Sequence, residues 1–67
     1  MNIGPALKKV RICKRYTQED IAEVLQITQQ QYSRYELGIH DIPVRYVIAL
    51  SKFYNVSADL LLGLQEE

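Results

Sequence analysis

The sequence contains a single cysteine, no long hydrophobic run and no leader pattern. One cysteine, Cys13, excludes a disulfide within the chain and is typical of proteins in a reducing compartment. No apolar run approaches the roughly 18 residues that a membrane-spanning helix needs, and the first residues do not form a signal peptide. We therefore expect a cytoplasmic protein that does not enter membranes and folds without covalent cross-links.

Residues that carry catalysis or hold metals are also scarce. The sequence pairs no nucleophile with a base and has no glycine-rich loop that would bind phosphates. Its one histidine, His40, has no cluster of metal-ligating residues around it. We expect no enzymatic activity, cofactor, metal site or small-molecule ligand. Cys13 is expected to be a helix residue without chemistry, although its basic neighbours Lys14 and Arg15 leave a thiol sensor open.

The chain has no net charge, because eight basic side chains balance eight acidic ones. Strong nucleic-acid binders usually carry a basic excess, so the total argues against DNA binding. The distribution is uneven, however. Residues 59–67 hold acidic side chains and no basic one, whereas residues 1–16 hold basic side chains and no acidic one, namely Lys8, Lys9, Arg11, Lys14 and Arg15. A neutral chain of this kind still presents one basic surface.

Three stretches contain the residues that begin helices. Thr17 is a good N-cap, and Asp20 three residues later can reach back to the N–H of the cap. Thr28 and Gln31 repeat this capping box, and Ser57 begins a weaker one. A length of 67 residues and an apolar fraction of 48% predict one small folded domain over residues 1–67.

The remaining helix signals complete an all-helical prediction. Pro43 suits a first turn, and Gly38 and Gly63 lie where helices could end. Apolar residues such as Leu50 and Phe53 recur at helical spacing. The segment VRYVIAL, residues 44–50, has the β-branched content of a strand, but its position after Pro43 favours a helix. We predict five helices and no strand, with the helices at about 3–15, 18–25, 29–37, 43–54 and 58–62.

The second and third predicted helices form a helix-turn-helix over about residues 17–37. Only about three residues separate them, so the helices must cross steeply with a small residue such as Ala22 at their contact. In this arrangement the second helix enters the major groove of DNA.

The segment 29–37 divides into two sides when each residue advances the helix by about 100°. Tyr32 and Tyr35 face the core, and Gln31 is better explained as the capping-box residue. Glutamine can bond adenine and arginine can bond guanine in the major groove, which fits DNA reading. The alternative is a plain solvated face, since such residues are common on exposed helices. The polar arc consists of Gln29, Gln30, Ser33 and Arg34.

Nearly all of the chain resembles the Cro/C1-type (lambda-repressor-like, XRE family) helix-turn-helix domain. The resemblance lies in the ordered set TQEDIA at residues 17–22, ITQQQYSRYELG at residues 27–38 and NVSADLLLG at residues 55–63. It implies a compact five-helix fold and sequence-specific binding of double-stranded DNA. The implied protein is a small transcriptional regulator, expected to be a repressor, that reads the major groove with helix 29–37.

The resemblance also implies roles for individual residues. Gln29, Gln30, Ser33 and Arg34 fall on base-contacting positions. Arg11 and Glu36 fall on positions that form an ion pair between the first and third helices. The expected phosphate contacts are Gln18, Thr17, Thr28, Lys8 and Lys14.

This chain departs from the family pattern at three places. Gln26 in the turn and Arg15 after the first helix stand where glycine is frequent, and a left-handed backbone at Gln26 would cost about 1 kcal/mol. The loop GIHDI, residues 38–42, lacks basic residues and contains Asp41, which would repel phosphates. Fewer phosphate contacts would weaken binding and reduce its salt dependence.

One recognition helix reads too few base pairs to bind tightly alone, so we expect a homodimer on a palindromic operator. Its expected interface is the fifth helix with Leu60 and Leu64; alternatively, Leu61 and Leu62 close the core and only Leu60 and Leu64 lie outside it. Two other functions stay open. One is an antitoxin-like regulator that also binds a toxin protein, and the other is a protein-interaction module that does not bind DNA.

Overall fold

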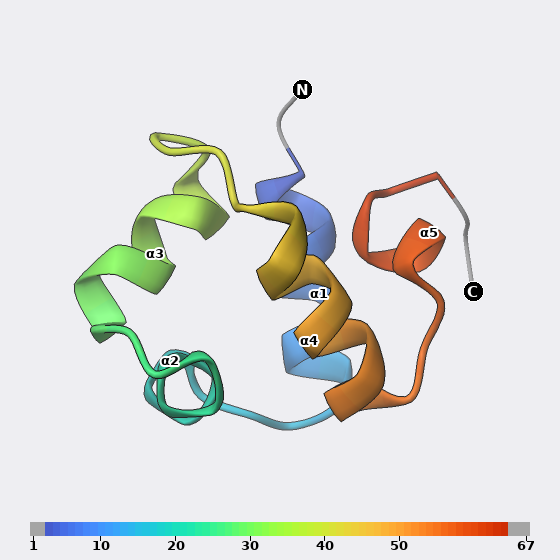
Figure 1. Ribbon diagram of the computed structural model, residues 1–67, viewed down its shortest axis with the longest axis horizontal. Helices are drawn as coiled ribbons and strands as arrows, with labels where there is room; N and C mark the ends of the chain where they lie inside the picture. The colour runs from blue at the N-terminus through green and yellow to red at the C-terminus, as the bar shows by residue number, and fades with distance from the viewer. Residues whose placement is uncertain (1–2, 65–67) are drawn as a thin grey trace.

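A computed structural model describes residues 3–64, which form five helices and no strand (Figure 1). This confirms the predicted all-α, five-helix fold. The first helix ends two residues before its predicted end, because Arg15 adopts a left-handed backbone with φ of 65°. The helices are α1 (Gly4–Cys13), α2 (Gln18–Leu25), α3 (Gln29–Leu37), α4 (Val44–Tyr54) and α5 (Ala58–Leu61).

Two threonine caps fix where α2 and α3 begin. The Thr17 hydroxyl accepts a hydrogen bond from the Asp20 N–H at 3.1 Å, and the Asp20 carboxylate accepts one from the Thr17 N–H at 2.9 Å. The Thr28 hydroxyl likewise accepts from the Gln31 N–H at 3.1 Å. The predicted return bond from Gln31 is wrong, since its side-chain amide instead donates to the Tyr35 hydroxyl one turn along the helix at 3.1 Å.

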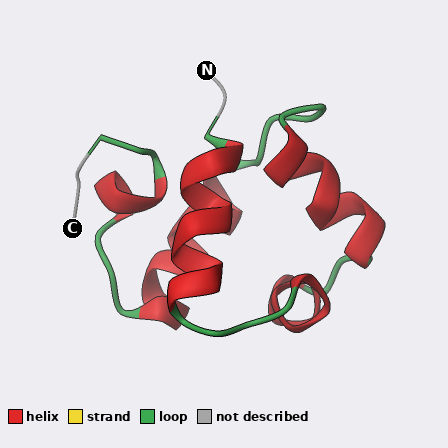
Figure 2. Cartoon of the chain, turned by 180° about the vertical axis from the view of Figure 1, so that it is seen from behind, coloured by secondary structure: helices red, strands yellow, loops and turns green. Residues whose placement is uncertain are grey.

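The helices surround one core and leave one side of α3 uncovered. α3 packs against α2 and α1, whereas α4 packs against α5 and α2, and α1 also contacts α5. Seen from either side, α3 stands at one edge of the molecule and α5 at the opposite edge (Figures 1 and 2). The outward side of α3 is therefore available to a partner.

The core is built from aliphatic and tyrosine side chains of all five helices. Tyr32 and Tyr35 face it, as predicted. Phe53, which helical spacing assigned to the buried side of α4, is instead 40% exposed. Its ring packs on the partly exposed Tyr16 at the edge of the core, with ring centroids 5.1 Å apart. The buried hydrophobic residues are Leu7, Val10, Ile21, Ala22, Leu25, Tyr32, Tyr35, Val47, Leu50, Tyr54 and Leu61.

The turn between α2 and α3 depends on a left-handed residue that is not glycine. Gln26 has φ of 58° and ψ of 43°, and Asn55 after α4 has φ of 57°. The turn is closed by the Ile27 N–H, which donates to the Ala22 carbonyl at 3.0 Å, and Ala22 is buried as predicted. A β-carbon is unfavourable in this conformation, although asparagine tolerates it better than glutamine does.

We expect Gln26→Gly to raise the free energy of unfolding by about 1 kcal/mol, because glycine adopts the left-handed conformation without strain. Asn55→Gly should change it by only a few tenths of a kcal/mol. Urea denaturation measures both. The control is Glu23→Gly, at an exposed position inside α2, which should lower the free energy of unfolding by about 1 kcal/mol. A Gln26→Gly variant as unstable as Glu23→Gly would contradict the assigned strain.

Candidate nucleic-acid interface

The outward side of α3 brings together the four residues predicted to contact bases. Gln29, Gln30 and Arg34 are exposed and Ser33 is half-buried. All four line one shallow hollow on the surface of α3. Their amide, hydroxyl and guanidinium groups can donate or accept hydrogen bonds in the pattern that base edges offer. Contact with DNA itself stays a prediction.

Two further residues line this hollow, and the sequence analysis did not single them out. Leu37 is 67% exposed and Ile39 is 63% exposed. A signal for Leu37 was available, because eight residues after Gln29 it returns to about 80° on the helical wheel, inside the polar arc. Ile39 follows the left-handed Gly38 beyond the end of α3, so helical periodicity could not place it.

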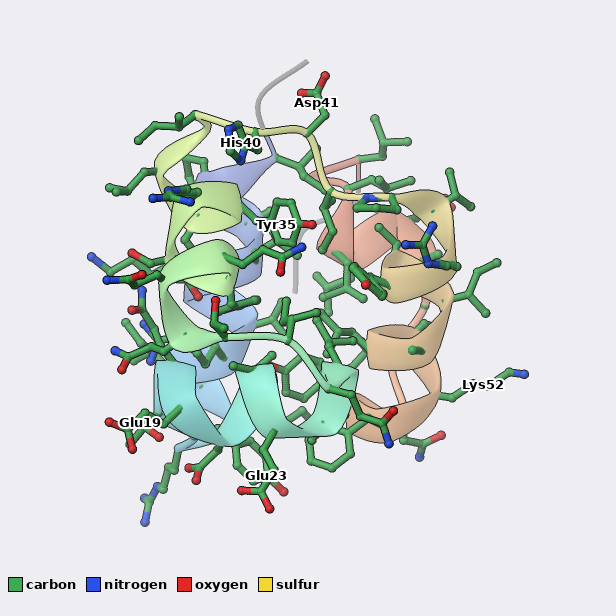
Figure 3. The ribbon with its side chains drawn as sticks, turned by 60° about the vertical axis from the view of Figure 1, so that its left-hand side comes forward. Glu19, Glu23, Tyr35, His40, Asp41 and Lys52 are labelled. Atoms are coloured by element: carbon green, nitrogen blue, oxygen red, sulfur yellow. The ribbon has the colours of Figure 1, made fainter. Side chains whose placement is uncertain are left out.

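The inward side of α3 is held by two tyrosines. Tyr32 has no exposed surface and Tyr35 is 6% exposed. The Tyr35 side chain points from α3 toward α4 (Figure 3), where its ring lies 6.2 Å from that of Tyr46. Burial of two large rings on one side fixes which residues of α3 face solvent.

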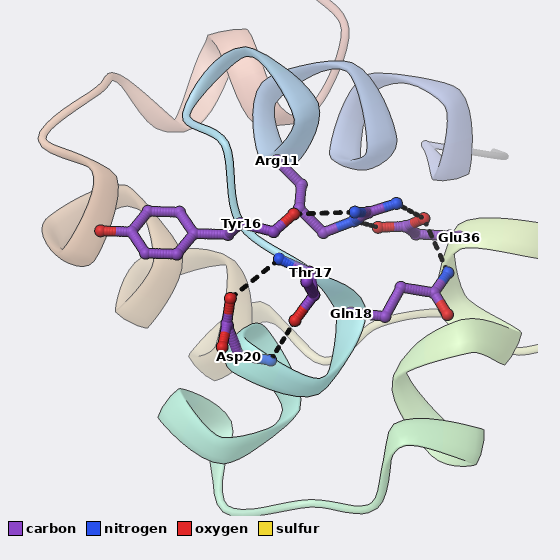
Figure 4. A network of polar contacts seen from close by, with 6 residues as sticks. All are labelled: Arg11, Tyr16, Thr17, Gln18, Asp20 and Glu36. Carbon is purple, nitrogen blue, oxygen red and sulfur yellow. Dashed lines mark hydrogen bonds and ion pairs between the residues drawn. The ribbon is translucent and has the colours of Figure 1, made fainter.

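A buried ion pair joins α3 to α1 (Figure 4). Arg11 Nε donates to Glu36 Oε2 at 2.7 Å and Arg11 Nη2 donates to Glu36 Oε1 at 3.2 Å. The two side chains are only 11% and 3% exposed. Arg11 Nη1 also donates to the Tyr16 carbonyl at 2.9 Å, which ties the pair to the loop before α2. Removal of one partner from such a pair typically costs about 3–5 kcal/mol.

Gln18 brings α2 into the same network. Its side-chain Nε2 donates to Glu36 Oε1 at 3.0 Å. An amide nitrogen has two hydrogens, so only one of them is used by this bond. The Gln18 backbone N–H lies in the first turn of α2, where the helix dipole favours an anion. The phosphate contact expected at Gln18 stays a prediction. Its backbone N–H is suited to a phosphate, whereas its side-chain amide already donates to Glu36.

The network sets the ionisation of its members. Burial raises the pKa of Glu36, but the Arg11 guanidinium, the Tyr32 hydroxyl and the Gln18 amide more than offset this, so the pKa lies below its ordinary value. The hydrogen bond to Glu36 raises the pKa of Arg11. Burial, and then the neighbouring Glu36 carboxylate, raises the pKa of Tyr32. Glu36 and Arg11 are therefore both charged at neutral pH.

The other predicted phosphate contacts lie on the surface. Thr17, Thr28, Lys8 and Lys14 are exposed. Both threonine hydroxyls already accept a bond from their own helix, and each keeps a hydrogen that it can donate. Of the basic residues near the N-terminus, Arg11 is the one engaged by Glu36, so the surface there is less basic than the count of residues indicates.

No helix within residues 3–64 is both long enough and apolar enough to cross a membrane. Over the same part of the chain, no three side chains of histidine, cysteine, aspartate or glutamate gather as metal ligands would.

Comparison with known proteins gave matches over most of the chain. The family described as Helix-turn-helix matches residues 7–61. The chain is 41% identical over 66 residues to HTH-type transcriptional regulator ImmR of Bacillus subtilis (strain 168). The matched residues make up 98% of this chain and 52% of that protein. It is 41% identical over 59 residues to the SPbeta prophage-derived uncharacterized HTH-type transcriptional regulator YonR of the same organism, covering 88% and 55%.

A third similar protein from this organism is the uncharacterized HTH-type transcriptional regulator YobD, 31% identical over 61 residues, or 91% of this chain and 54% of that protein. The chain thus spans about half the length of the curated relatives it matches. No solved structure matches the chain.

We expect Glu36 to make stability depend on pH in the acid range. Because its pKa is lower in the folded state than the ordinary 4.5, its contribution is complete above about pH 4.5 and is lost as the pH falls through the folded pKa. The melting temperature of Glu36→Gln should therefore fall less steeply below about pH 4.5 than that of the wild type. The control is Glu19→Gln, which removes an exposed carboxylate of α2 and should keep the wild-type slope. An unchanged slope in Glu36→Gln would contradict the assignment.

Proposed function

The chain belongs to the helix-turn-helix family, and we propose that it regulates transcription by placing α3 in the major groove of a specific double-stranded DNA sequence. We further propose that it acts as a repressor. The similar proteins are HTH-type transcriptional regulators by name. The observation that carries the proposal is the division of α3 into a tyrosine side held in the core and a polar side left in solvent.

The base contacts are assigned to the polar side. Gln29 and Gln30 lie in the first turn of α3, and residues at this end of a recognition helix reach base edges. Each glutamine amide can bond adenine N6 and N7 together, and Arg34 can bond guanine O6 and N7. Ser33, between them on the helix surface, is assigned to a base or a neighbouring phosphate.

Phosphate contacts orient the protein on the duplex. The N-termini of α2 and α3 supply the side-chain hydroxyls of Thr17 and Thr28, respectively. The N-terminus of α2 also supplies the backbone N–H of Gln18. Lys8 and Lys14 add two exposed cations from α1 and its end. With Asp41 exposed in the loop after α3, we expect few phosphate contacts and a shallow salt dependence.

The length of α3 favours a dimer. Its nine residues extend about 13 Å, which spans about four base pairs at about 3.4 Å each. We propose that two copies bind a palindromic operator with half-sites roughly one helical turn apart. Leu64 is 67% exposed, whereas Leu60 packs partly against the core, so Leu64 is the stronger candidate for the interface. The acidic Glu66 and Glu67 lie outside the described residues.

The two alternatives have weaker support. The names of the similar proteins describe transcriptional regulators, which does not favour an antitoxin-like role or a module without DNA binding. The module without DNA binding is an outcome of the binding experiment below, because a chain that selects no DNA would direct the search to a protein partner. An antitoxin-like regulator would still select its operator, and binding to a toxin protein would distinguish it.

We expect the wild type to select one palindrome from a randomised DNA pool. Gln30→Ala should bind the selected site about tenfold more weakly and lose its preference at one base pair of each half-site, since one bidentate contact is removed. Lys14→Ala should weaken binding to all sequences alike and reduce the salt slope by about one. Fluorescence anisotropy at two salt concentrations measures these effects.

The matched control for this experiment is Lys52→Ala. Lys52 is an exposed cation of α4 that points away from α3 (Figure 3), so its removal should leave binding unchanged. If the wild type binds no DNA even at about 20 mM salt, where phosphate attraction is least screened, the proposal fails.

We expect the free protein to dimerise through its C-terminal surface, and Leu64→Glu to make it monomeric by placing a charge in an apolar interface. Ile12→Glu is the control, since Ile12 is also a large exposed apolar residue, at 54%, but lies on α1. Sedimentation velocity measures the assembly state. A wild type that remains monomeric at high micromolar concentration would contradict this dimer.

A further inference from the structure

The exposed apolar pair Leu37 and Ile39 lies next to the polar side of α3. Neither residue belongs to the core cluster, and both line the hollow that Gln29, Gln30, Ser33 and Arg34 also line. Single exposed leucines are ordinary on protein surfaces. Two large aliphatic side chains that share a hollow with the proposed base contacts require a separate explanation.

The backbone holds the two side chains in place. Gly38 takes a left-handed conformation with φ of 76°, which ends α3 and reverses the chain. The Ile39 N–H then donates to the Arg34 carbonyl at 3.0 Å, so Ile39 is returned to the last turn of α3. The apolar pair is therefore attached to the recognition helix itself and moves with it.

The partner that fits this pair is an apolar group on a base edge. Among the groups that the major groove exposes, the C5-methyl of thymine is the apolar one. Neither Leu37 nor Ile39 has a side-chain donor for a phosphate, and the loop 38–42 has no lysine or arginine. A thymine contact also fits the position of the pair, because Leu37 and Ile39 line the same hollow as the residues assigned to bases.

Resting on the proposed DNA binding, we propose that Leu37, with Ile39 beside it, recognises the C5-methyl group of a thymine in each half-site. Leu37 lies eight residues after Gln29, which is about 12 Å along the helix. That distance corresponds to about three to four base pairs. The thymine is therefore expected about three to four base pairs from the pair that Gln29 contacts.

The test removes the methyl group and nothing else from the DNA. Each thymine of the operator selected by the wild type is replaced in turn by uracil, and dissociation constants are measured by anisotropy. At one position of each half-site the replacement should weaken wild-type binding about three- to fivefold, the effect of exposing one methyl group. Leu37→Ala should bind the thymine and uracil sites equally, and Ile39→Ala should show a reduced difference.

Two control variants separate the methyl contact from other roles. Leu37→Met conserves apolar volume and should keep most of the discrimination between thymine and uracil. Ile12→Ala removes another large exposed apolar side chain, on α1, and should keep all of the discrimination. Two further DNA sites carry cytosine or 5-methylcytosine in place of this thymine. The wild type should bind the 5-methylcytosine site more tightly than the cytosine site, because the methyl group is present on a different base.

The outcomes separate this inference from the function on which it rests. A wild type that binds no DNA overturns the proposed function and, with it, the inference. A wild type that selects an operator but is indifferent to uracil at every position overturns the inference alone. The same follows if Leu37→Ala keeps the full discrimination. The inference alone is also overturned if Leu37→Ala weakens binding to the thymine and uracil sites by the same factor and shifts the protein from dimer to monomer. Leu37 would then belong to a contact between copies of the chain.

Discussion

The carboxylate of Glu36 is the point on which the arrangement of the first three helices depends. It accepts hydrogen bonds from Arg11 of α1 and from Gln18 of α2, and Arg11 also binds the Tyr16 carbonyl of the connecting loop. A charge with so little exposure is stable only while its partners stay in place. The position of α3 relative to α1 and α2 is thus specified by a few directional bonds as well as by packing.

This constraint matters because α3 contributes little apolar surface to the core. Tyr32 and Tyr35 are its buried hydrophobic residues, and Leu37 faces solvent. Two rings and one ion pair must therefore orient the helix, and they do so from one side of it. The opposite side can then vary in sequence without loss of the fold, which is what a surface that reads DNA sequences requires. Its combination of amides, a guanidinium and two aliphatic groups matches the chemistry of major-groove base edges.

The neutral net charge is consistent with such a surface. Of the five basic residues within positions 1–16, Arg11 is neutralised by Glu36 inside the protein. The hollow on the outward side of α3, where base contacts are proposed, contains one charge, Arg34, among uncharged groups. Binding that relies on hydrogen bonds and methyl contacts more than on phosphates would favour discrimination between sequences over tight binding to any duplex.

The sequence alone determined the features that depend on neighbouring residues. Capping threonines fixed the starts of α2 and α3, and periodicity turned Tyr32 and Tyr35 inward and the four polar residues outward. The left-handed turn at Gln26 was expected only from the resemblance, because glycine is frequent there in the family. Apart from the Arg11–Glu36 pair, which the resemblance implied, only the tertiary structure decided which groups met from different elements. It bonded the Gln18 amide to Glu36, drew Leu60 partly into the core and returned Ile39 to the end of α3. Local rules cannot give these outcomes, because each depends on how the chain beyond a turn or a helix end is placed in space.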